Sequence, residues 1–377
     1  MKVLIDLSFI RNADLSIGFS RVSVLLVSSF LKLRSFDDFI LLIDNSSKDY
    51  FTARFSKCRI FSFDFKTVFW GSLHFWILKR KISKIINDYK IGLFFCPFIS
   101  ARSVLPRNLN AIGILHDVQK LKIVSDSFLV ALAYKYFMFF QISRFDQIIT
   151  ISNSEKKHIL DMIPKLFNKI QVVHNGVETC AFTKKVKEVP QNCKYILDIN
   201  TLFEYKNALT LIKAFEIIKD EIPHILILKG KITSYWSEVL QPYIVEHNLQ
   251  TRVILIDRIL EDSEVAYLYQ NADVFVSPSL MEGFGLTPVE AAIYGTPVIC
   301  SDIDTLREAT MELVDYFSPM DYQQLSCILK LKLQKKDKAK LQSISKKLSS
   351  EYSLLEQAKR FLKIFDEYEN NNSNTSI

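Results

Sequence analysis

The sequence predicts an α/β protein made of two doubly wound, Rossmann-like domains that face a central cleft. Its 377 residues fit two domains of roughly 100–200 residues each. Short apolar runs alternate with longer helical patterns from one end of the chain to the other, which is typical of parallel sheets covered by helices. The alternation stops once, over 181–193, where the chain loses its periodicity and gathers charge. We therefore expect an interdomain linker there.

The first domain is expected to span residues 1–180. Its predicted strands are 3–7, 39–43, 92–96, 111–115, 147–151 and 169–173. Helical patterns cover 21–33 and 77–89, and a further helix is expected between 115 and 147. The last strand runs into H-N-G at 174–176, which is a turn signal.

The second domain, 194–350, repeats the alternation. Its predicted strands are 195–199, 224–229, 253–256, 274–277 and 297–300, and its predicted helices are 208–219, 234–247, 263–269 and 288–294. A C-terminal helix over 351–368 could pack back on the first domain. The tail E-N-N-N-S-N-T-S-I, at 369–377, is expected to be disordered because it has almost no apolar side chains to bury.

Composition and net charge indicate the cellular compartment of the protein and the kinds of partner that it could bind. The net charge of +7 suits a nucleotide substrate or an anionic membrane surface, and is too low to indicate nucleic acid. A merely solubilising charge explains it equally well. The six cysteines form no C-x-x-C pair, which favours free thiols in a reducing compartment. The start M-K-V-L-I-D-L-S reads as a strand, not a signal peptide, and we expect no membrane-spanning helix. These features favour a cytoplasmic protein.

The stretch S-P-S-L-M-E-G-F-G-L-T-P-V-E, at 277–290, follows a predicted strand and opens a helix. Thr287 is expected to be the N-cap, with Pro288 as the first helical residue and Glu290 closing a capping box. A capping box alone would explain Glu290. It would leave Glu282 and the intervening glycines unexplained.

A ligand explains all of these residues together. The start of a helix offers unpaired N–H groups and partial positive charge, which suit a phosphate. Gly283 and Gly285 allow the backbone to approach a ligand closely, and Glu282 and Glu290 can accept hydrogen bonds from vicinal hydroxyls of a sugar. The segment therefore predicts a site for a sugar nucleotide.

The same residues resemble a known enzyme family. E-G-F-G-L-T-P-V-E, preceded by A-D-V-F-V-S-P-S and followed by A-A-I-Y-G-T-P-V-I, is similar to the E-x(7)-E signature of glycosyltransferase family 4. Members are retaining, metal-independent enzymes of the GT-B fold. The resemblance is specific over about 195–310 and looser in the first domain, which would be the acceptor side.

The resemblance implies a hexosyltransferase. A sugar would move from a nucleotide-diphosphate donor to a hydroxyl of a glycan or lipid-linked glycan, with retention and with no metal cofactor. Surface polysaccharide assembly, such as O-antigen of lipopolysaccharide or capsule, is the expected setting. A nucleotide-sugar epimerase of the same fold and a non-catalytic nucleotide-sugar-binding subunit are the alternatives.

The resemblance also assigns roles around the two glutamates. It implies that Glu282 faces the donor sugar and that Glu290 binds the nucleotide ribose. The backbone of Phe284, Gly285 and Leu286 would lie beside the diphosphate and the sugar.

Lys206 lies in Y-I-L-D-I-N-T-L-F-E-Y-K-N, between a predicted strand and a predicted helix. A lone lysine in a loop is usually just exposed. The surroundings, however, resemble the family's R-K-N loop, whose lysine neutralises the donor diphosphate. Tyr205 stands where the family usually has arginine, and Asn200 where some members have another. The missing cations keep the non-catalytic alternative open.

Three further positions are carried over from the resemblance. His116 ends a strand of the first domain and would reach the donor sugar across the cleft, with Asp117 orienting its ring. A histidine at a strand end is otherwise more often structural. Gly18 would belong to a glycine loop that meets the diphosphate. Ile259 would lie near the base, although Arg258 replaces the small residue usual before it.

Two other patterns can be explained either by a function or by ordinary surface structure. Asp302-Ile303-Asp304 is a D-x-D, which holds a metal diphosphate in another glycosyltransferase fold, but here it reads as a surface loop. The helix F-W-I-L-K-R-K-I-S-K-I-I, at 75–86, could lie peripherally on an anionic membrane. A packed helix with a solvated basic face explains it equally well.

Overall fold

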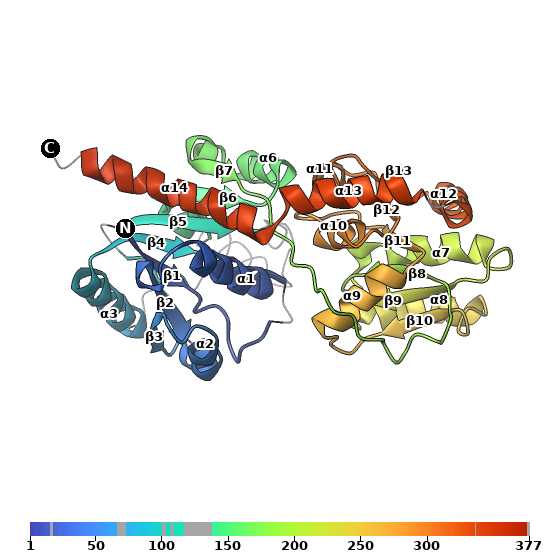
Figure 1. Ribbon diagram of the computed structural model, residues 1–377, viewed down its shortest axis with the longest axis horizontal. Coiled ribbons are helices and arrows are strands. Elements are labelled where there is room, and N and C mark those ends of the chain that lie inside the picture. The colour runs from blue at the N-terminus through green and yellow to red at the C-terminus, as the bar shows by residue number, and fades with distance from the viewer. Residues whose placement is uncertain are drawn as a thin grey trace. The chain divides into compact units, whose positions relative to one another are not determined.

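The structure is a computed structural model, and it describes residues 1–15, 18–65, 73–99, 103–106, 109–116, 138–335 and 337–374. The chain divides into two compact units (Figure 1). Unit 1 comprises Met1–Gly176 together with Leu354–Ile377, and unit 2 comprises Val177–Ser353. Each unit is built around its own parallel sheet, as the alternating pattern predicted.

Unit 1 contains, in its described part, a seven-stranded parallel sheet in the order β3-β2-β1-β4-β5-β6-β7. The strands are β1 (Lys2–Asp6), β2 (Phe39–Asp44), β3 (Arg59–Phe63), β4 (Ile91–Cys96), β5 (Asn110–Leu115), β6 (Gln147–Thr150) and β7 (Ile170–Val172). The central strands are buried almost throughout, because helices cover both faces of a parallel sheet. The edge strand β3 has no fully buried residue, and the sequence pattern did not reveal it.

The described helices of unit 1 are α1 (Gly18–Leu33), α2 (Lys48–Arg54), α3 (Leu73–Tyr89), α6 (Asn153–Met162) and α14 (Leu354–Asn374), with short helical turns η1 (Phe36–Asp38), η2 (Asn45–Ser47) and η3 (Pro164–Lys169). The helix expected between 115 and 147 falls mostly outside the described residues.

The last helix, α14, returns to unit 1 and packs against α1. Phe361 and Phe365 lie edge-on to Phe30, with ring centroids 6.2 and 5.6 Å away. The N-terminal ammonium of Met1 pairs with Glu369 at 2.6 Å. The helix continues to Asn374, so the expected disorder of 369–377 is wrong for 369–374. Tertiary packing on α1 stabilises a helix that its polar C-terminal sequence does not signal.

Unit 2 contains a six-stranded parallel sheet in the order β10-β9-β8-β11-β12-β13, counted over its described residues. The strands are β8 (Tyr195–Ile199), β9 (Ile225–Lys229), β10 (Val253–Ile256), β11 (Val274–Ser277), β12 (Val298–Ser301) and β13 (Asp315–Phe317). The helices are α7 (Ala208–Ile218), α8 (Gln241–Glu246), α9 (Asp262–Asn271), α10 (Leu286–Ile293), α11 (Asp304–Ala309), α12 (Tyr322–Gln334) and α13 (Lys338–Glu351), with the 3₁₀ turn η4 (Glu204–Lys206) and the π-helical turn η5 (Trp236–Leu240).

The expected linker, 181–193, is part of unit 2, and the boundary lies at Gly176, not at 180. Val186 and Val189 are buried. The backbone N–H of Lys184 donates to the carbonyl of Ser263, and its ammonium pairs with Glu261 at 2.8 Å. Two of the charges that made this segment resemble a linker, Lys184 and Glu188, form ion pairs with Glu261 and Arg258.

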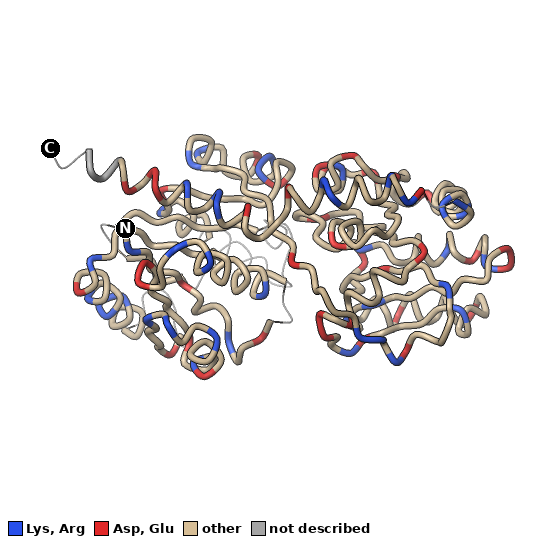
Figure 2. Tube along the Cα trace, in the orientation of Figure 1, with Lys and Arg blue, Asp and Glu red and all other residues tan. Residues whose placement is uncertain are grey.

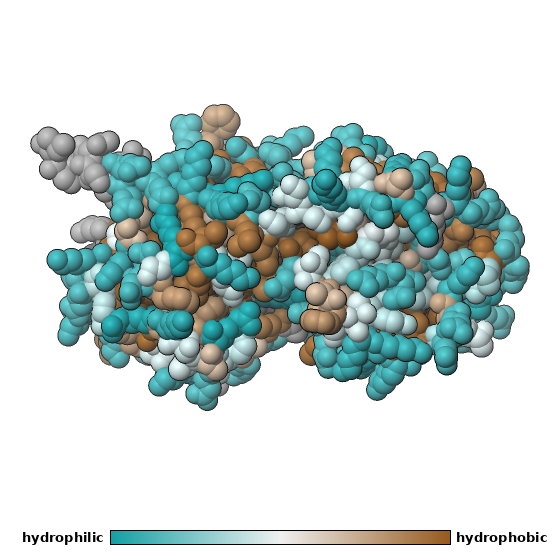
Figure 3. All heavy atoms as spheres, in the orientation of Figure 1, coloured by the Kyte–Doolittle hydropathy of each residue, from teal (hydrophilic) through white to brown (hydrophobic). Residues whose placement is uncertain are grey.

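The surface of both units carries basic and acidic residues interspersed along the chain (Figure 2). The face shown in Figure 3 is mostly hydrophilic, with apolar residues in separate patches. Within the described ranges, no helix combines the length and the apolar character that crossing a membrane requires.

Candidate functional site

The turn after β8 places Lys206 at the carboxyl edge of the unit 2 sheet. Lys206 is the last residue of η4, and Asn207 follows with φ of 57°, a left-handed conformation that asparagine tolerates. The Asn207 amide donates to the carbonyl of Pro278 at 3.0 Å and accepts from the Thr210 hydroxyl at 2.7 Å. The lysine loop is therefore fixed against the loop that follows β11.

Lys206 and Glu282, 76 positions apart in the sequence, form an ion pair. The Lys206 Nζ lies 2.6 Å from Glu282 Oε1, and the two side chains are only 14% and 12% exposed. A backbone hydrogen bond of 2.8 Å from Leu280 N–H to the carbonyl of Tyr205 holds the two loops together. The structure thus brings together two of the residues that the sequence predicted.

The prediction of a capping box at Glu290 is wrong. Helix α10 begins at Leu286, and its N-cap is Gly285, with φ of 98° and no side-chain cap. Glycine reaches this left-handed conformation without strain, so the chain turns into the helix two residues before the expected cap, Thr287. A Cβ at Gly285 would also lie 2.7 Å from Leu306 Cδ2. The first turn of α10 therefore presents backbone amides and no capping carboxylate.

Glu290 is instead held from the neighbouring helix α9. The Tyr269 hydroxyl donates to Glu290 Oε2 at 2.8 Å, and the Tyr269 ring is buried and stacks on Tyr294. Thr296 donates to the carbonyl of Tyr269 at 2.5 Å. One carboxylate oxygen of Glu290 is thereby fixed in position by a buried partner.

Phe284 turns its side chain into the protein. It is 3% exposed, and its ring packs edge-on against Tyr352 at 5.3 Å. Since the ring anchors the loop from inside, the backbone of 284–286 is the part of this segment that a ligand could contact, which is the role that the family resemblance implies.

Asp198 was missed by the sequence reading. It is 1% exposed at the end of β8, and its Oδ1 accepts from the Asn200 amide at 2.6 Å. Burial raises the pKa of Asp198 to about 7, with the Asn200 hydrogen bond and Lys206 lowering it and Glu282 raising it. The signal was the acid itself, in the otherwise apolar strand Y-I-L-D-I.

Gly230, after β9, fixes the position of Asn200. A Cβ at Gly230 would lie 1.8 Å from the Asn200 carbonyl oxygen. Only glycine allows the two backbones to approach this closely. Asn200, which the resemblance marked as a missing arginine, is thus part of a closely packed turn beside Asp198.

Arg258 and Ile259 follow the edge strand β10, two strands away from β8. Ile259 is 79% exposed. The Arg258 guanidinium is bidentate on Glu188 at 2.7 and 3.1 Å and on Glu264 at 2.7 and 3.0 Å. Its hydrogen bonds lower the pKa of Glu264 to about 2. Arg258 therefore joins the segment before β8 to helix α9.

The D-x-D segment forms surface structure. Arg307 binds Asp302 through Nε at 2.5 Å and Nη2 at 2.8 Å, which lowers the pKa of Asp302. Asp304 is the first residue of α11.

In unit 1, His116 follows β5 at the carboxyl edge of the sheet. It is 8% exposed, and its Nε2 lies 2.9 Å from the carbonyl oxygen of Pro97. A carbonyl only accepts, so Nε2 carries the proton in this pair. The rings of Phe98 and Phe19 lie 6.0 and 6.4 Å away. Asp117 lies outside the described residues.

Gly18 is the first residue of α1, and a Cβ there would meet no described atom within 4 Å. The packing of the described residues therefore imposes no requirement for glycine at this position.

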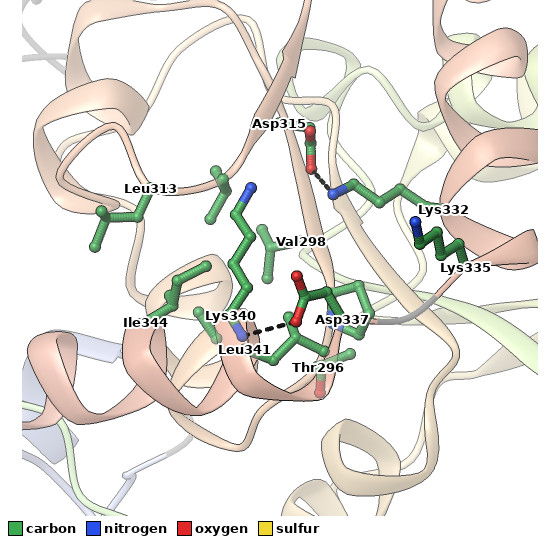
Figure 4. Close-up of a pocket in the computed structure, with 13 residues that line it drawn as sticks. Thr296, Val298, Leu313, Asp315, Lys332, Lys335, Asp337, Lys340, Leu341 and Ile344 are labelled. Atoms are coloured by element: carbon green, nitrogen blue, oxygen red, sulfur yellow. Dashed lines mark hydrogen bonds and ion pairs between the residues drawn. The ribbon is translucent and has the colours of Figure 1, made fainter.

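A separate cavity of about 250 Å³ lies among α10, β12, β13 and the α12–α13 connection (Figure 4). Its floor is apolar, and Asp315 pairs there with Lys332. Asp337 caps α13 by accepting from the backbone N–H of Lys340 at 3.0 Å, while the Lys335 side chain is exposed. A ligand site needs a few fixed polar groups to orient its ligand. The carboxylates of this cavity already serve the protein's own structure, and it contains none of the predicted site residues.

Comparison with known proteins shows which sequences this chain is similar to. Residues 181–345 match the family model described as glycosyl transferases group 1. The O-antigen chain mannosyltransferase RfbU of Salmonella typhimurium is 28% identical over 257 residues, which are 67% of each chain. The O-antigen chain mannosyltransferase B of Escherichia coli is 32% identical over 142 residues, 37% of each chain.

Solved structures share the fold across nearly the whole chain. A glycosyltransferase from Rickettsia africae superposes with a TM-score of 0.73 at 18% identity, covering 98% of this chain and 99% of that one. Anabaena Alr3699/HepE, solved in complex with UDP and glucose, gives a TM-score of 0.72 at 16% identity, covering 97% and 100%. The chain therefore has the GT-B fold, and its residues 181–345 match the glycosyl transferases group 1 model.

Proposed function

We propose that the protein is a retaining glycosyltransferase of family 4. It moves a hexose from a nucleotide-diphosphate sugar to a hydroxyl of a glycan or lipid-linked glycan. The observation that carries the proposal is the Lys206–Glu282 pair, held at the carboxyl edge of the sheet in the same domain as the glycine-capped start of α10. The names of the relatives favour mannose as the sugar and O-antigen assembly as the setting.

The chemistry follows from where the charges lie. The Lys206 ammonium neutralises the donor diphosphate and stabilises the charge that develops on the departing nucleotide. The amides in the first turn of α10, at Leu286 and Thr287, add partial positive charge at the same phosphates. A lysine and a helix terminus together supply the electrostatic role that a metal ion plays elsewhere, so we propose a reaction that is independent of metal.

The two glutamates bind the hydroxyls at either end of the donor. Glu282, already paired with Lys206, accepts hydrogen bonds from the sugar. Glu290 accepts from the ribose, and its orientation is fixed by the Tyr269 hydroxyl. Because Tyr269 is buried, it holds the Glu290 carboxylate in one orientation, in which we expect it to accept from the ribose hydroxyls.

A thermal-shift screen of GDP-, UDP- and dTDP-sugars tests the proposal. We expect one class of nucleotide sugar to raise the melting temperature of the wild-type protein and to lose that effect in Glu290→Ala. If no nucleotide sugar raises the melting temperature, or if the substitution leaves the shift unchanged, the donor assignment is wrong.

Product analysis separates transfer from the two alternatives. A glycosyltransferase consumes donor in proportion to glycosylated acceptor. An epimerase would release an altered donor with no acceptor present, and a non-catalytic subunit would bind donor without turnover. No contact among the described residues favours either alternative.

We also propose that the protein works on the cytoplasmic side, with α3 as a peripheral membrane contact. Leu73, Trp76 and Ile77 are 76%, 44% and 42% exposed on this helix, and Arg80 and Lys84 are exposed beside them. Phe75, Leu78 and Ile82 hold its opposite face in the core. Sedimentation with anionic liposomes at low salt, and its loss at high salt, is the expected result; indifference to lipid charge and salt would contradict membrane docking.

A further inference from the structure

Asp198 is a buried acid on which the charges of both Lys206 and Glu282 act. Oδ1 accepts from Asn200, but Oδ2 is fully buried and has no hydrogen-bond partner among the residues that the structure describes. Such a group destabilises a folded protein because it has lost water without gaining a partner, so its presence requires an explanation. The apolar residues of the same strand show that packing alone does not require an acid here.

The groups around Asp198 define its electrostatic environment. On β9 its register partner is Leu228, which carries no charge. The charges that act on it are Lys206 of η4 and Glu282 of the loop after β11, which are paired with each other. Within β8 and its turn, the Asn200 amide and the Ile199 backbone N–H are the polar groups that lower the pKa of Asp198. Asp198 therefore senses the net charge of the Lys206–Glu282 pair, which is close to zero in the structure without a ligand.

We propose that Asp198 is a proton-holding positioning residue of the donor site: it is protonated when the nucleotide sugar is bound, so that donor affinity depends on pH. This inference rests on the proposed function, because it assumes that the diphosphate binds at Lys206. It adds a residue and a proton linkage that the E-x(7)-E and lysine motifs do not contain.

The sign follows from the charges. A bound diphosphate brings negative charge to Lys206, and an ionised Asp198 would both repel it and compete for the ammonium. Binding therefore favours the protonated form, which carries no charge to repel the diphosphate. With a pKa of about 7 in the free protein, Asp198 is mostly neutral at pH 6 and mostly ionised at pH 8. Donor affinity is thus highest below pH 7 and falls above it, by up to about tenfold per pH unit.

A purely structural role makes a different prediction. If Asp198 only orients Asn200, its replacement changes stability or affinity by the same factor at every pH. Asp198→Asn separates the two roles, because the amide has the size of the carboxyl group and stays neutral at all pH values. Asp302→Asn is a matched control, since Asp302 is an exposed acid that follows β12 at the same edge of the sheet.

The test measures the dissociation constant of the nucleotide sugar that stabilises the full-length protein, by calorimetry between pH 5.5 and 8.5. A nucleotide sugar is suitable because its diphosphate is a diester and does not titrate in this range. We expect the wild-type constant to rise about tenfold from pH 6 to pH 8, and the same rise in Asp302→Asn. Asp198→Asn should stay close to the wild-type value at pH 6 throughout.

Three results would overturn the inference: a flat wild-type profile, an unchanged slope in Asp198→Asn, or equally weakened binding of that variant at all pH values. Should the variant fail to fold, calorimetry of the wild-type protein at pH 7.5 in buffers of different ionisation enthalpy decides the matter. Net proton uptake on binding supports the inference, and its absence refutes it. Failure of every nucleotide sugar to bind at any pH would instead refute the proposed function.

Discussion

Unit 2 holds its candidate residues through side chains from several elements, whereas in unit 1 the described contacts of His116 are a backbone carbonyl and two phenylalanine rings. Lys206 is paired with Glu282, and Glu290 is bonded by Tyr269. His116 lies 2.9 Å from the Pro97 carbonyl, which any residue could provide. Side chains that contact one another restrict the residue type at both positions, whereas every residue type can supply a backbone carbonyl. The family model matches residues 181–345, which lie within unit 2.

The largest expected effect is the loss of Lys206. Replacing it with alanine removes the cation at the diphosphate and leaves Glu282 unpaired in a mostly buried position. We expect the transfer rate to fall by about 10²–10³, as for the loss of one preorganised electrostatic group. Initial rates with saturating donor measure this. Lys347→Ala, an exposed lysine on α13, should leave the rate within about twofold.

Glycine substitutions in the two units test the comparison through stability. Gly230→Ala forces a Cβ against the Asn200 carbonyl, so we expect a loss of about 1–3 kcal/mol and a melting temperature lower by several degrees. Gly18→Ala meets no described atom and adds a good helix former to α1, so it should be neutral or slightly stabilising. Equal melting temperatures for the two variants would show that unit 2 is less tightly packed than its contacts indicate.

His116→Ala measures what unit 1 contributes. If the histidine binds the donor sugar, as the family resemblance implies, the transfer rate should fall roughly fivefold to tenfold, the value of one hydrogen bond. The circular dichroism of the variant should remain that of the wild type. His158→Ala is the control: this half-buried histidine of α6 pairs with Glu155, and its loss should leave the transfer rate unchanged. A variant as impaired as Lys206→Ala would show that unit 1 contributes as much as unit 2.

The smallest expected effect concerns Glu264, which Arg258 binds. The folded pKa of about 2 lies below the ordinary value near 4.5, so the ion pair contributes stability above pH 4.5 and loses it as the pH falls toward 2. Glu264→Gln should lower the urea midpoint at pH 7, and the difference from wild type should shrink at pH 3. Glu221→Gln, which removes a more exposed partner of Lys330, should change the midpoint less. A difference that grows with acid would contradict this assignment.

Much of the architecture could be predicted because apolar runs and helical periodicity are local signals. Strands 253–256 and 274–277 were predicted at their observed limits. Strand β3 was missed because it lies at the edge of the sheet, where its side chains are only half-buried. Its sequence therefore contains no continuous apolar run. The linker prediction failed for a related reason: Glu188 and Lys184 look like solvated charges until Arg258 and Glu261 are seen beside them.

At the candidate site, the motif residues were visible but their contacts were not. The loop 282–290 and Lys206 stood out because glycine, proline and paired acids are distinctive at those spacings. The wrong cap at Thr287 shows the limit of such reasoning, because a Thr-Pro-x-Glu pattern and a left-handed glycine both start helices. Only the packing of Gly285 against Leu306 selects the glycine.

The sequence by itself determined that the chain alternates strands and helices in two domains, and that a glycine-rich loop between two glutamates precedes a helix. Those are properties of residues close together in the chain. Tertiary structure alone decided that Lys206 pairs with Glu282 across 76 positions, that Tyr269 holds Glu290, and that Asp198 is buried beside them. Parallel strands bring their carboxyl ends to one edge of a sheet, so loops distant in sequence meet there. The pKa of an acid such as Asp198 therefore depends on how the fold buries it and on the charged groups that the fold places near it.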